Sequence, residues 1–264
     1  MPLNLGGITK ELVNALHESA TFLRKEYESF SIEKIEKKGR YNNLVSYVDK
    51  QAEEMLVESL SEILPQAGFV TEENTTSIGK KEYNWIIDPL DGTTNFMHGL
   101  PIFSTTAALM HGDEVLLGAT IDPLRSEVYY AWKGGGAWMN NQPIKVTSTT
   151  TVEDSLIITG FPYDLKGHTE KYYALIQQFT NTCHGVRRLG SAALDMAYVA
   201  SGRAEAFFEY NLNIWDIAAG IILVQEAGGK VSDFHGGNKY LDGSEVLAAG
   251  NAHNAILDVI NKNW

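Results

Sequence analysis

The chain has 264 residues, is 44% hydrophobic and 20% charged, and carries a formal net charge of -12. This composition is typical of a globular protein with a core large enough to need no disulfides, in one large domain or two intimate ones. The negative charge disfavours broad binding to a nucleic-acid backbone, but it does not exclude small anionic substrates, because bound metals can invert the local charge.

The cysteine content and the hydropathy pattern predict the cellular compartment of the protein. Cys183 is the only cysteine, which excludes an internal disulfide and fits a reducing compartment such as the cytoplasm. We find neither a signal-peptide pattern nor an apolar run long enough to span a bilayer. The expected partner is therefore a small molecule, not a membrane or a nucleic acid.

The first quarter of the chain predicts two helices with a lysine-rich segment between them. Apolar residues recur at helical spacing from Ile8 to Tyr27 and again from Val48 to Ile63. The lysine-rich segment, residues 32–39, is typical of a solvated face. Ser46 to Asp49 resembles a capping box that opens the second helix, so Asp49 is expected to cap it, or alternatively to orient a catalytic water.

Residues 85–96 read Trp-Ile-Ile-Asp-Pro-Leu-Asp-Gly-Thr-Thr-Asn-Phe and contain two acids at a corner. The apolar run to Ile87 predicts a buried strand that ends at the Asp-Pro and Asp-Gly turn signals. Proline restricts the residue before it, and glycine permits a sharp turn, so Asp88 and Asp91 should lie on one rigid corner that opens a short helix. Such dipeptides also occur in ordinary turns, and this stretch alone does not decide between the two interpretations.

Two further acids lie at the ends of apolar segments. Glu72 follows the run from Gly68 to Val70, and Asp216 starts an otherwise apolar helix. Four acids placed in this way predict a carboxylate cluster, which repels itself unless cations neutralise it. Ligand sets made only of oxygen favour hard cations, Mg²⁺ before Ca²⁺ or Mn²⁺.

The remaining pattern predicts an antiparallel meander followed by alternating helices and strands. Residues 103–110, 115–121 and 128–132 predict the meander, and Gly134 to Gly136 a loop. Beyond Thr151 the expected strands are 155–159, 204–209 and 246–249, and the expected helices are 170–179, 191–200, 215–227 and a last one capped by Asn251. We expect two halves, residues 1–150 and 151–264, that share one interface.

Taken together, these motifs resemble the inositol monophosphatase family, a branch of the metal-dependent, lithium-sensitive phosphatases. The resemblance covers nearly the whole chain and is carried by four segments: Thr71-Glu72-Glu73, Trp85 to Asn95, Gly190-Ser191-Ala192-Ala193, and Trp215 to Gly220 with Glu226 to Gly229. Gly160-Phe161-Pro162-Tyr163 is similar to bacterial members. The family implies a fold of the α/β (α+β) class, a layered α-β-α-β-α sandwich, and a homodimer.

The resemblance also implies roles for individual residues. Those matching the family's metal ligands are Glu72, Asp88, the Leu90 carbonyl, Asp91 and Asp216. Those matching its catalytic and supporting positions are Glu72 and Thr93, which position the water, with Lys38 and Asp49 in support. Those matching its substrate contacts are Asp91, Gly92, Thr93, Ser191, Ala192, Glu209 and Asp216. One departure is Thr71, where many members have glycine, which is expected to crowd the loop but leave the ligands intact.

The activity implied is hydrolysis of a small phosphorylated polyol, inositol 1-phosphate before NADP 2′-phosphate, fructose 1,6-bisphosphate or adenosine bisphosphate. The resemblance implies two or three Mg²⁺ ions, with Mn²⁺ or Ca²⁺ as substitutes and Li⁺ and Ca²⁺ as inhibitors. A haloacid dehalogenase site would need an aspartate nucleophile at position 89, where this chain has proline. The alternative from another class is a noncatalytic, metal-binding regulatory module.

Overall fold

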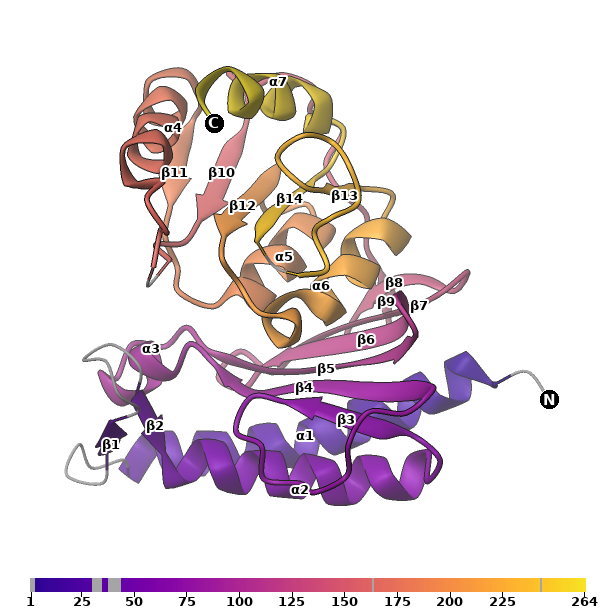
Figure 1. The fold of residues 1–264 in the computed structure, drawn as a ribbon. Coiled ribbons are helices and arrows are strands. Elements are labelled where there is room, and N and C mark those ends of the chain that lie inside the picture. The colour runs from indigo at the N-terminus through magenta and orange to yellow at the C-terminus, as the bar shows by residue number, and fades with distance from the viewer. Residues whose placement is uncertain (1–2, 30–34, 38–43, 163, 243) are drawn as a thin grey trace.

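The computed structural model describes residues 3–29, 35–37, 44–162, 164–242 and 244–264. Its helices and sheets stack in five layers in the order helix, sheet, helix, sheet, helix (Figure 1). The α-β-α-β-α sandwich predicted from the sequence is therefore confirmed. Among the described helices, none is both long and apolar enough to cross a membrane.

The first layer consists of α1 (Leu5–Ser29) and α2 (Tyr47–Ile63), which lie side by side against the larger sheet (Figure 1). Their apolar stripes pack on the strands in one core, as the helical spacing predicts. Between them the structure describes an antiparallel pair, β1 (Ile35–Lys37) and β2 (Leu44–Ser46). The role expected for Lys38 falls outside the described residues.

The second layer is a seven-stranded sheet in which each strand lies next to its neighbour in sequence. Only β3 and β4 pair in parallel, and the meander predicted after the acidic corner is confirmed. In spatial order the strands are β3 (Gly68–Thr71), β4 (Tyr83–Asp91), β5 (Ser104–His111), β6 (Glu114–Asp122), β7 (Glu127–Trp132), β8 (Gly136–Met139) and β9 (Gln142–Pro143).

Strand β4 differs from the prediction that it ends at Ile87, because it continues through the corner to Asp91. Its register with β5 shifts between Asp88 and Asp91, and Pro89 lies within this irregularity. Proline has no N–H to donate to a ladder, so a bulge is where a strand accommodates it. The corner is thus a bulge in a paired strand, which holds the acids more firmly than a free turn would.

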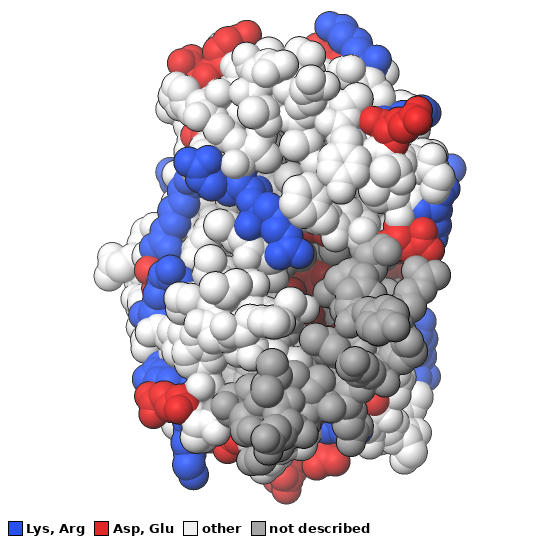
Figure 2. All heavy atoms as spheres, turned by 90° about the vertical axis from the view of Figure 1, so that its left-hand side faces the viewer, with Lys and Arg blue, Asp and Glu red and all other residues white. Residues whose placement is uncertain are grey.

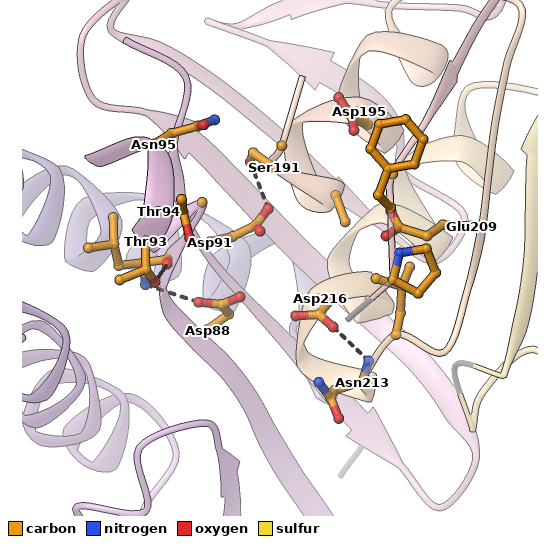
Figure 3. Close-up of a pocket in the computed structure, with 18 of the residues that line it drawn as sticks. Asp88, Asp91, Thr93, Thr94, Asn95, Ser191, Asp195, Glu209, Asn213 and Asp216 are labelled. Carbon is orange, nitrogen blue, oxygen red and sulfur yellow. Dashed lines mark hydrogen bonds between the residues drawn. The ribbon is translucent and has the colours of Figure 1, made fainter. Parts of the chain in front are cut away.

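The middle layer consists of α5 (Ala192–Ala200) and α6 (Ile214–Glu226), which pack against both sheets. Both helices are apolar around almost their whole circumference, as expected for helices buried between two sheets. Their N-termini point toward the acidic corner of β4, which brings residues more than 100 positions apart to one place (Figure 3).

The second sheet and two outer helices complete the sandwich. The sheet order is β11 (Gly185–Arg187), β10 (Leu156–Thr159), β12 (Ala206–Tyr210), β14 (Glu245–Ala249) and β13 (Lys230–Ser232). The outer face is covered by α4 (Thr169–Thr182) and α7 (His253–Asn263). The prediction that Asn251 caps the last helix is wrong, because the N-cap is Ala252 and makes no side-chain cap bond.

Candidate active site

A pocket opens where the bulge of β4, the short helix α3 (Thr93–Met97), the N-termini of α5 and α6, and the end of β12 meet (Figure 3). The described residues that line it include a single cation, Arg188, and six acids: Glu72, Asp88, Asp91, Asp195, Glu209 and Asp216. On the face shown in Figure 2, acidic atoms are visible deep in a central hollow beside a group of basic side chains. The pocket is therefore strongly acidic inside.

The bulge of β4 fixes the first two acids. Asp88 is only 1% exposed, and the Leu90 N–H donates to its Oδ1 over 3.0 Å. Gly92 follows with φ of 92°, a left-handed conformation that favours glycine. A Cβ at position 92 would also lie 3.0 Å from the Gly190 carbonyl oxygen and 3.1 Å from that of Ile102. Glycine is thus required here for both conformation and space.

Thr93 is held by two elements. Its Oγ1 lies 2.9 Å from the Leu90 carbonyl oxygen and 3.1 Å from Asp49 Oδ1. Asp49 lies in the first turn of α2 and is 1% exposed. Its carboxylate accepts the Thr93 hydroxyl inside the protein. Asp49 therefore lies in the first turn of α2 and contacts Thr93 at the same time.

Asp91 joins β4 to α5. Its Oδ2 accepts the Ser191 hydroxyl at 2.6 Å and the Ala193 N–H at 2.8 Å. Ser191 is the N-cap of α5 and is 1% exposed, and Ala192 also lines the pocket. The carboxylate therefore satisfies the free N–H groups of a helix terminus while facing the pocket.

Asp216 is held at the start of α6 by a capping box. Its Oδ2 accepts the Asn213 N–H at 2.6 Å, and Asn213 is the N-cap (Figure 3). The Asp216 carboxylate also faces Asp88 and Asp91 in the pocket, and both acids influence its pKa. The sequence placed this acid at a helix start, and the structure brings it to the bulge of β4.

Glu72 depends on an acid that sequence reasoning missed. Glu53, on α2 and 0% exposed, accepts the Glu73 N–H and the Thr75 N–H, each at 2.7 Å. These bonds fasten the loop that leaves β3, so that Glu72 faces the pocket. An acid next to the apolar stripe of α2 was the available signal, because glutamate is rarely buried without a partner. Thr71 is buried at the end of β3 and does not displace this loop from the pocket.

The pKa values of the four clustered acids are all raised above their usual range. Burial first, and then repulsion by Glu72, Asp91 and Asp216, raises the pKa of Asp88 well above its usual range. Burial and repulsion by Asp216 similarly raise the pKa of Glu72. Burial raises the pKa of Asp91 to about 6, and burial with repulsion by Asp91 raises that of Asp216 to about 7. The cluster is therefore costly to ionise unless positive charge is supplied.

Divalent cations fit this chemistry. The donors are all oxygens, and the like charges need neutralisation, which matches hard cations such as Mg²⁺. Among the described residues, no three Asp, Glu, His or Cys side chains converge on one point as a ready-made metal cage. Glu72 and Asp216 each lie within hydrogen-bonding reach of Asp88. A magnesium shell usually takes only one or two protein carboxylates besides waters and phosphate oxygens, so a ready-made cage of three is not required.

Glu209 lies on the opposite side of the pocket. It is 8% exposed and belongs to β12, where it pairs with Val246. Glu209 is therefore a buried acid and not a solvated one at a strand end. Burial first, and then repulsion by Asp216 and Asp91, raises its pKa to about 8. The pocket residues that the sequence did not single out as site residues include Asn95, Gly160, Arg188, Asp195 and Asn213.

The comparisons with known proteins decide the family. A model described as the inositol monophosphatase family matches residues 5–264. The chain belongs to this family. Within it, the chain is similar to an inositol-1-monophosphatase of Mesorhizobium japonicum, with 38% identity over 253 residues and 95% of each chain covered.

Two further relatives illustrate the breadth of the family. Nus factor SuhB of Escherichia coli strain K12 is 38% identical over 237 residues, which cover 89% of this chain and 88% of the relative. The solved structure of an inositol monophosphatase from Anabaena (Nostoc) sp. PCC 7120 has a TM-score of 0.88 at 32% identity and covers 99% of this chain and 98% of its own. The family predicted from the sequence is thus confirmed, and the haloacid dehalogenase alternative is excluded.

Proposed function

We propose that this family member is a magnesium-dependent phosphomonoesterase that hydrolyses a small phosphorylated polyol, inositol 1-phosphate before the other family substrates. The observation that carries the proposal is the set of four acids, Glu72, Asp88, Asp91 and Asp216, which three separate elements bring to one pocket. Their mutual repulsion is relieved by cations, and the same cations attract a phosphate.

The proposed roles follow from the contacts of each residue. Bound Mg²⁺ would neutralise charge on the phosphoryl oxygens. It would also lower the pKa of a water molecule, so that this water loses a proton readily and becomes a better nucleophile. The four carboxylates and the Leu90 carbonyl would hold the ions. Thr93, whose hydroxyl is fixed between Leu90 and Asp49, would orient the attacking water together with Glu72. Gly92 and Thr93 line the pocket and would offer their N–H groups to the phosphate.

Direct attack by water is the mechanism that fits the corner. An aspartyl-phosphate route would need a carboxylate at position 89, and Pro89 in the bulge offers none. With two or three Mg²⁺ ions per subunit, as the resemblance implies, we also propose inhibition by Li⁺ and Ca²⁺ and assembly as a homodimer in the cytoplasm.

Release of inorganic phosphate tests the proposed activity. The assay takes inositol 1-phosphate, NADP, fructose 1,6-bisphosphate and adenosine 3′,5′-bisphosphate, each with Mg²⁺ and with a chelator. The proposal expects Mg²⁺-dependent release with inositol 1-phosphate giving the highest kcat/KM. Release from none of the four substrates would contradict it, whereas a different preferred substrate would correct the substrate and keep the chemistry.

Replacing Glu209 by glutamine is expected to raise KM for inositol 1-phosphate and to spare kcat and the Mg²⁺ dependence. Glu209 faces the pocket from the side opposite the β4 corner. A hydrogen bond between its carboxyl group and a substrate hydroxyl contributes roughly 0.5–1.5 kcal/mol, or about two- to tenfold in KM. p-Nitrophenyl phosphate has no such hydroxyls and serves as the control substrate. Equal losses on both substrates would mean that Glu209 supports the whole site and does not recognise the alcohol.

A second candidate function comes from the name Nus factor that the Escherichia coli relative carries. It corresponds to the noncatalytic alternative, in which the fold serves a partner and hydrolysis is dispensable. Complementation of Escherichia coli cells that lack SuhB, by the wild-type chain and by its Asp88→Asn variant, separates the two. Growth restored equally by both would support the noncatalytic role, and growth restored only by the wild type would support hydrolysis.

A further inference from the structure

We propose that Glu53 is a positioning residue for the reaction: it fastens the loop after β3 and thereby fixes Glu72 relative to Thr93, so that both can orient one water molecule. The inference rests on the proposed phosphatase function and deepens it. Glu53 matches none of the residues to which the family resemblance gives a role, and it is not among the described residues that line the pocket. Its effect on the reaction therefore has to pass through another residue.

The first observation is that one loop uses both oxygens of a fully buried carboxylate. Glu53 is 0% exposed on the buried side of α2. Its Oε2 accepts the Glu73 N–H at 2.7 Å, and its Oε1 accepts the Thr75 N–H at 2.7 Å and the Thr75 hydroxyl at 2.9 Å. Burying a carboxylate costs desolvation free energy, and an apolar side chain would serve the packing of α2 at least as well. The acid is therefore explained by what it holds, which is the backbone directly after Glu72.

The second observation is that the loop carrying Glu72 is irregular and that its acid is repelled. Residues 72–82 belong to no helix or strand. Asn74 has φ of 54°, in the left-handed region that residues other than glycine adopt rarely. Burial first, and then repulsion by Asp216 and two further acids, raises the pKa of Glu72, and the same repulsion pushes its carboxylate away from the pocket. The bonds to Glu53 hold the loop in place against this repulsion.

The third observation is that α2 supports the other water-orienting residue from the same face. Asp49 lies four residues before Glu53, and residues four apart in an α-helix lie on one face, about one turn apart. The Oδ1 atom of Asp49 accepts the Thr93 hydroxyl at 3.1 Å. Successive turns of one helix thus hold Thr93 and the loop of Glu72. A rigid element, and not two independent loops, sets the separation of the two groups.

Kinetics of the Glu53→Gln variant test the inference with the substrate that the wild type hydrolyses best. Glutamine keeps the size of the side chain but offers one acceptor and one NH₂ donor, so it cannot accept from both N–H groups of the loop. We expect kcat to fall about 10–100-fold and the Mg²⁺ affinity to fall with it, as is typical for a residue that supports a metal ligand. The KM for the substrate should change less than about twofold, because Glu53 makes no contact with the substrate.

A double-mutant cycle with Glu72→Gln separates positioning from a general loss of structure. When Glu53 acts through Glu72, the double variant loses at most about twofold more kcat or Mg²⁺ affinity than Glu72→Gln alone. A general loosening of the fold would lower both quantities in either background, so the losses would multiply. Calorimetric Mg²⁺ titration supplies this cycle even for variants that turn over too slowly to measure.

Hydrogen exchange gives a readout that needs neither metal nor turnover. In the metal-free protein, the peptide covering residues 72–78 should exchange faster in Glu53→Gln than in the wild type, because the N–H groups of Glu73 and Thr75 lose an acceptor. Thr75→Val is the second variant and removes only the hydroxyl that donates to Glu53, so the buried face of α2 is unchanged. Its kcat should fall at least about twofold with KM unchanged.

The matched control is Asp122→Asn, which changes another buried carboxylate that holds a turn. Asp122 is 1% exposed, accepts the N–H groups of Leu124 and Arg125 after β6, and lies outside the pocket. The control should lower Tm, as Glu53→Gln should. Its kcat, its Mg²⁺ affinity and its exchange over residues 72–78 should remain those of the wild type.

The outcomes separate the role of Glu53 from the proposed function. An unchanged kcat for Glu53→Gln, a KM increase as large as the loss of kcat, unchanged exchange over residues 72–78, or losses that multiply with those of Glu72→Gln would overturn the inference. A wild type that hydrolyses no substrate would reject the phosphatase and leave the Mg²⁺ affinities to decide. A lower affinity in Glu53→Gln that disappears in the Glu72→Gln background would then keep the positioning role, and equal affinities would reject it.

Discussion

Asp88→Asn is expected to abolish Mg²⁺-dependent phosphate release while the protein stays folded. Asp88 is buried between Glu72, Asp91 and Asp216, and it is the acid whose pKa these three neighbours raise together with burial. Loss of a residue that merely supports a metal ligand typically costs about 10–100-fold in metal affinity or activity, so loss of a proposed ligand should cost more. The fold should survive because asparagine retains an oxygen that accepts the Leu90 N–H.

Calorimetric titration with Mg²⁺ measures the metal affinity of the variant, and thermal unfolding measures the stability of its fold. In the absence of cations the variant should be at least as stable as the wild type near neutral pH, because it removes one of several repelling carboxylates. Unchanged Mg²⁺ affinity and turnover would remove Asp88 from the site. A large loss of Tm with normal Mg²⁺ affinity would assign the residue to the fold instead.

Removal of divalent cations is expected to abolish activity and to make the stability of the protein fall as pH rises. The raised pKa values, about 6 for Asp91 and about 7 for Asp216, lie above those of the unfolded chain. Below about pH 4 these carboxyl groups are protonated in both the folded and the unfolded chain, so they do not lower the free energy of unfolding. As pH rises through their folded pKa values, they ionise in the folded protein as well and this stability is lost. The chelated protein should therefore lose Tm progressively between about pH 4 and pH 8.

Added Mg²⁺ should reverse this trend, because it binds the ionised carboxylates and only the folded chain presents them together. Unfolding temperatures at pH 5.5 and pH 8, with a chelator and with Mg²⁺, should show the largest Mg²⁺ stabilisation at pH 8. The Asp88→Asn variant is the control and should show a smaller pH slope and a smaller Mg²⁺ effect. Equal Mg²⁺ stabilisation at both pH values would contradict the electrostatic account of the cluster.

Much of the fold could be predicted from local pattern. The helices α1 and α2 have clear apolar periods of their own, and α5, α6 and the meander β5–β6–β7 have apolar runs; these elements form close to where the sequence predicts them. The strands β8, β9, β11 and β13 are two to four residues long, and pairing with a neighbour defines them more than their own sequence does. Asn251 is not the cap because α7 begins at His253 and Ala252 occupies the N-cap position.

The candidate site could be predicted only where its residues carry a local sequence signal. Asp88, Asp91 and Asp216 carry turn or helix-start signals of their own, so the sequence marks them before any contact is known. Glu53 and Asp195 are acids inside helices, and ordinary solvated acids look the same in sequence. Their burial depends on the packing of distant segments, and Glu53 in addition contacts the loop after β3.

Single-turnover hydrolysis of inositol 1-phosphate in isotopically labelled water tests the central claim most directly. In the proposed mechanism the pocket carboxylates hold the cations and Thr93 orients the water, while Pro89 provides no carboxylate for a covalent intermediate. We predict Mg²⁺-dependent turnover with the label in the released phosphate and no phosphoprotein trapped by rapid denaturation. Trapped phospho-aspartate, or no phosphate release by the wild-type protein with Mg²⁺ present, would contradict it.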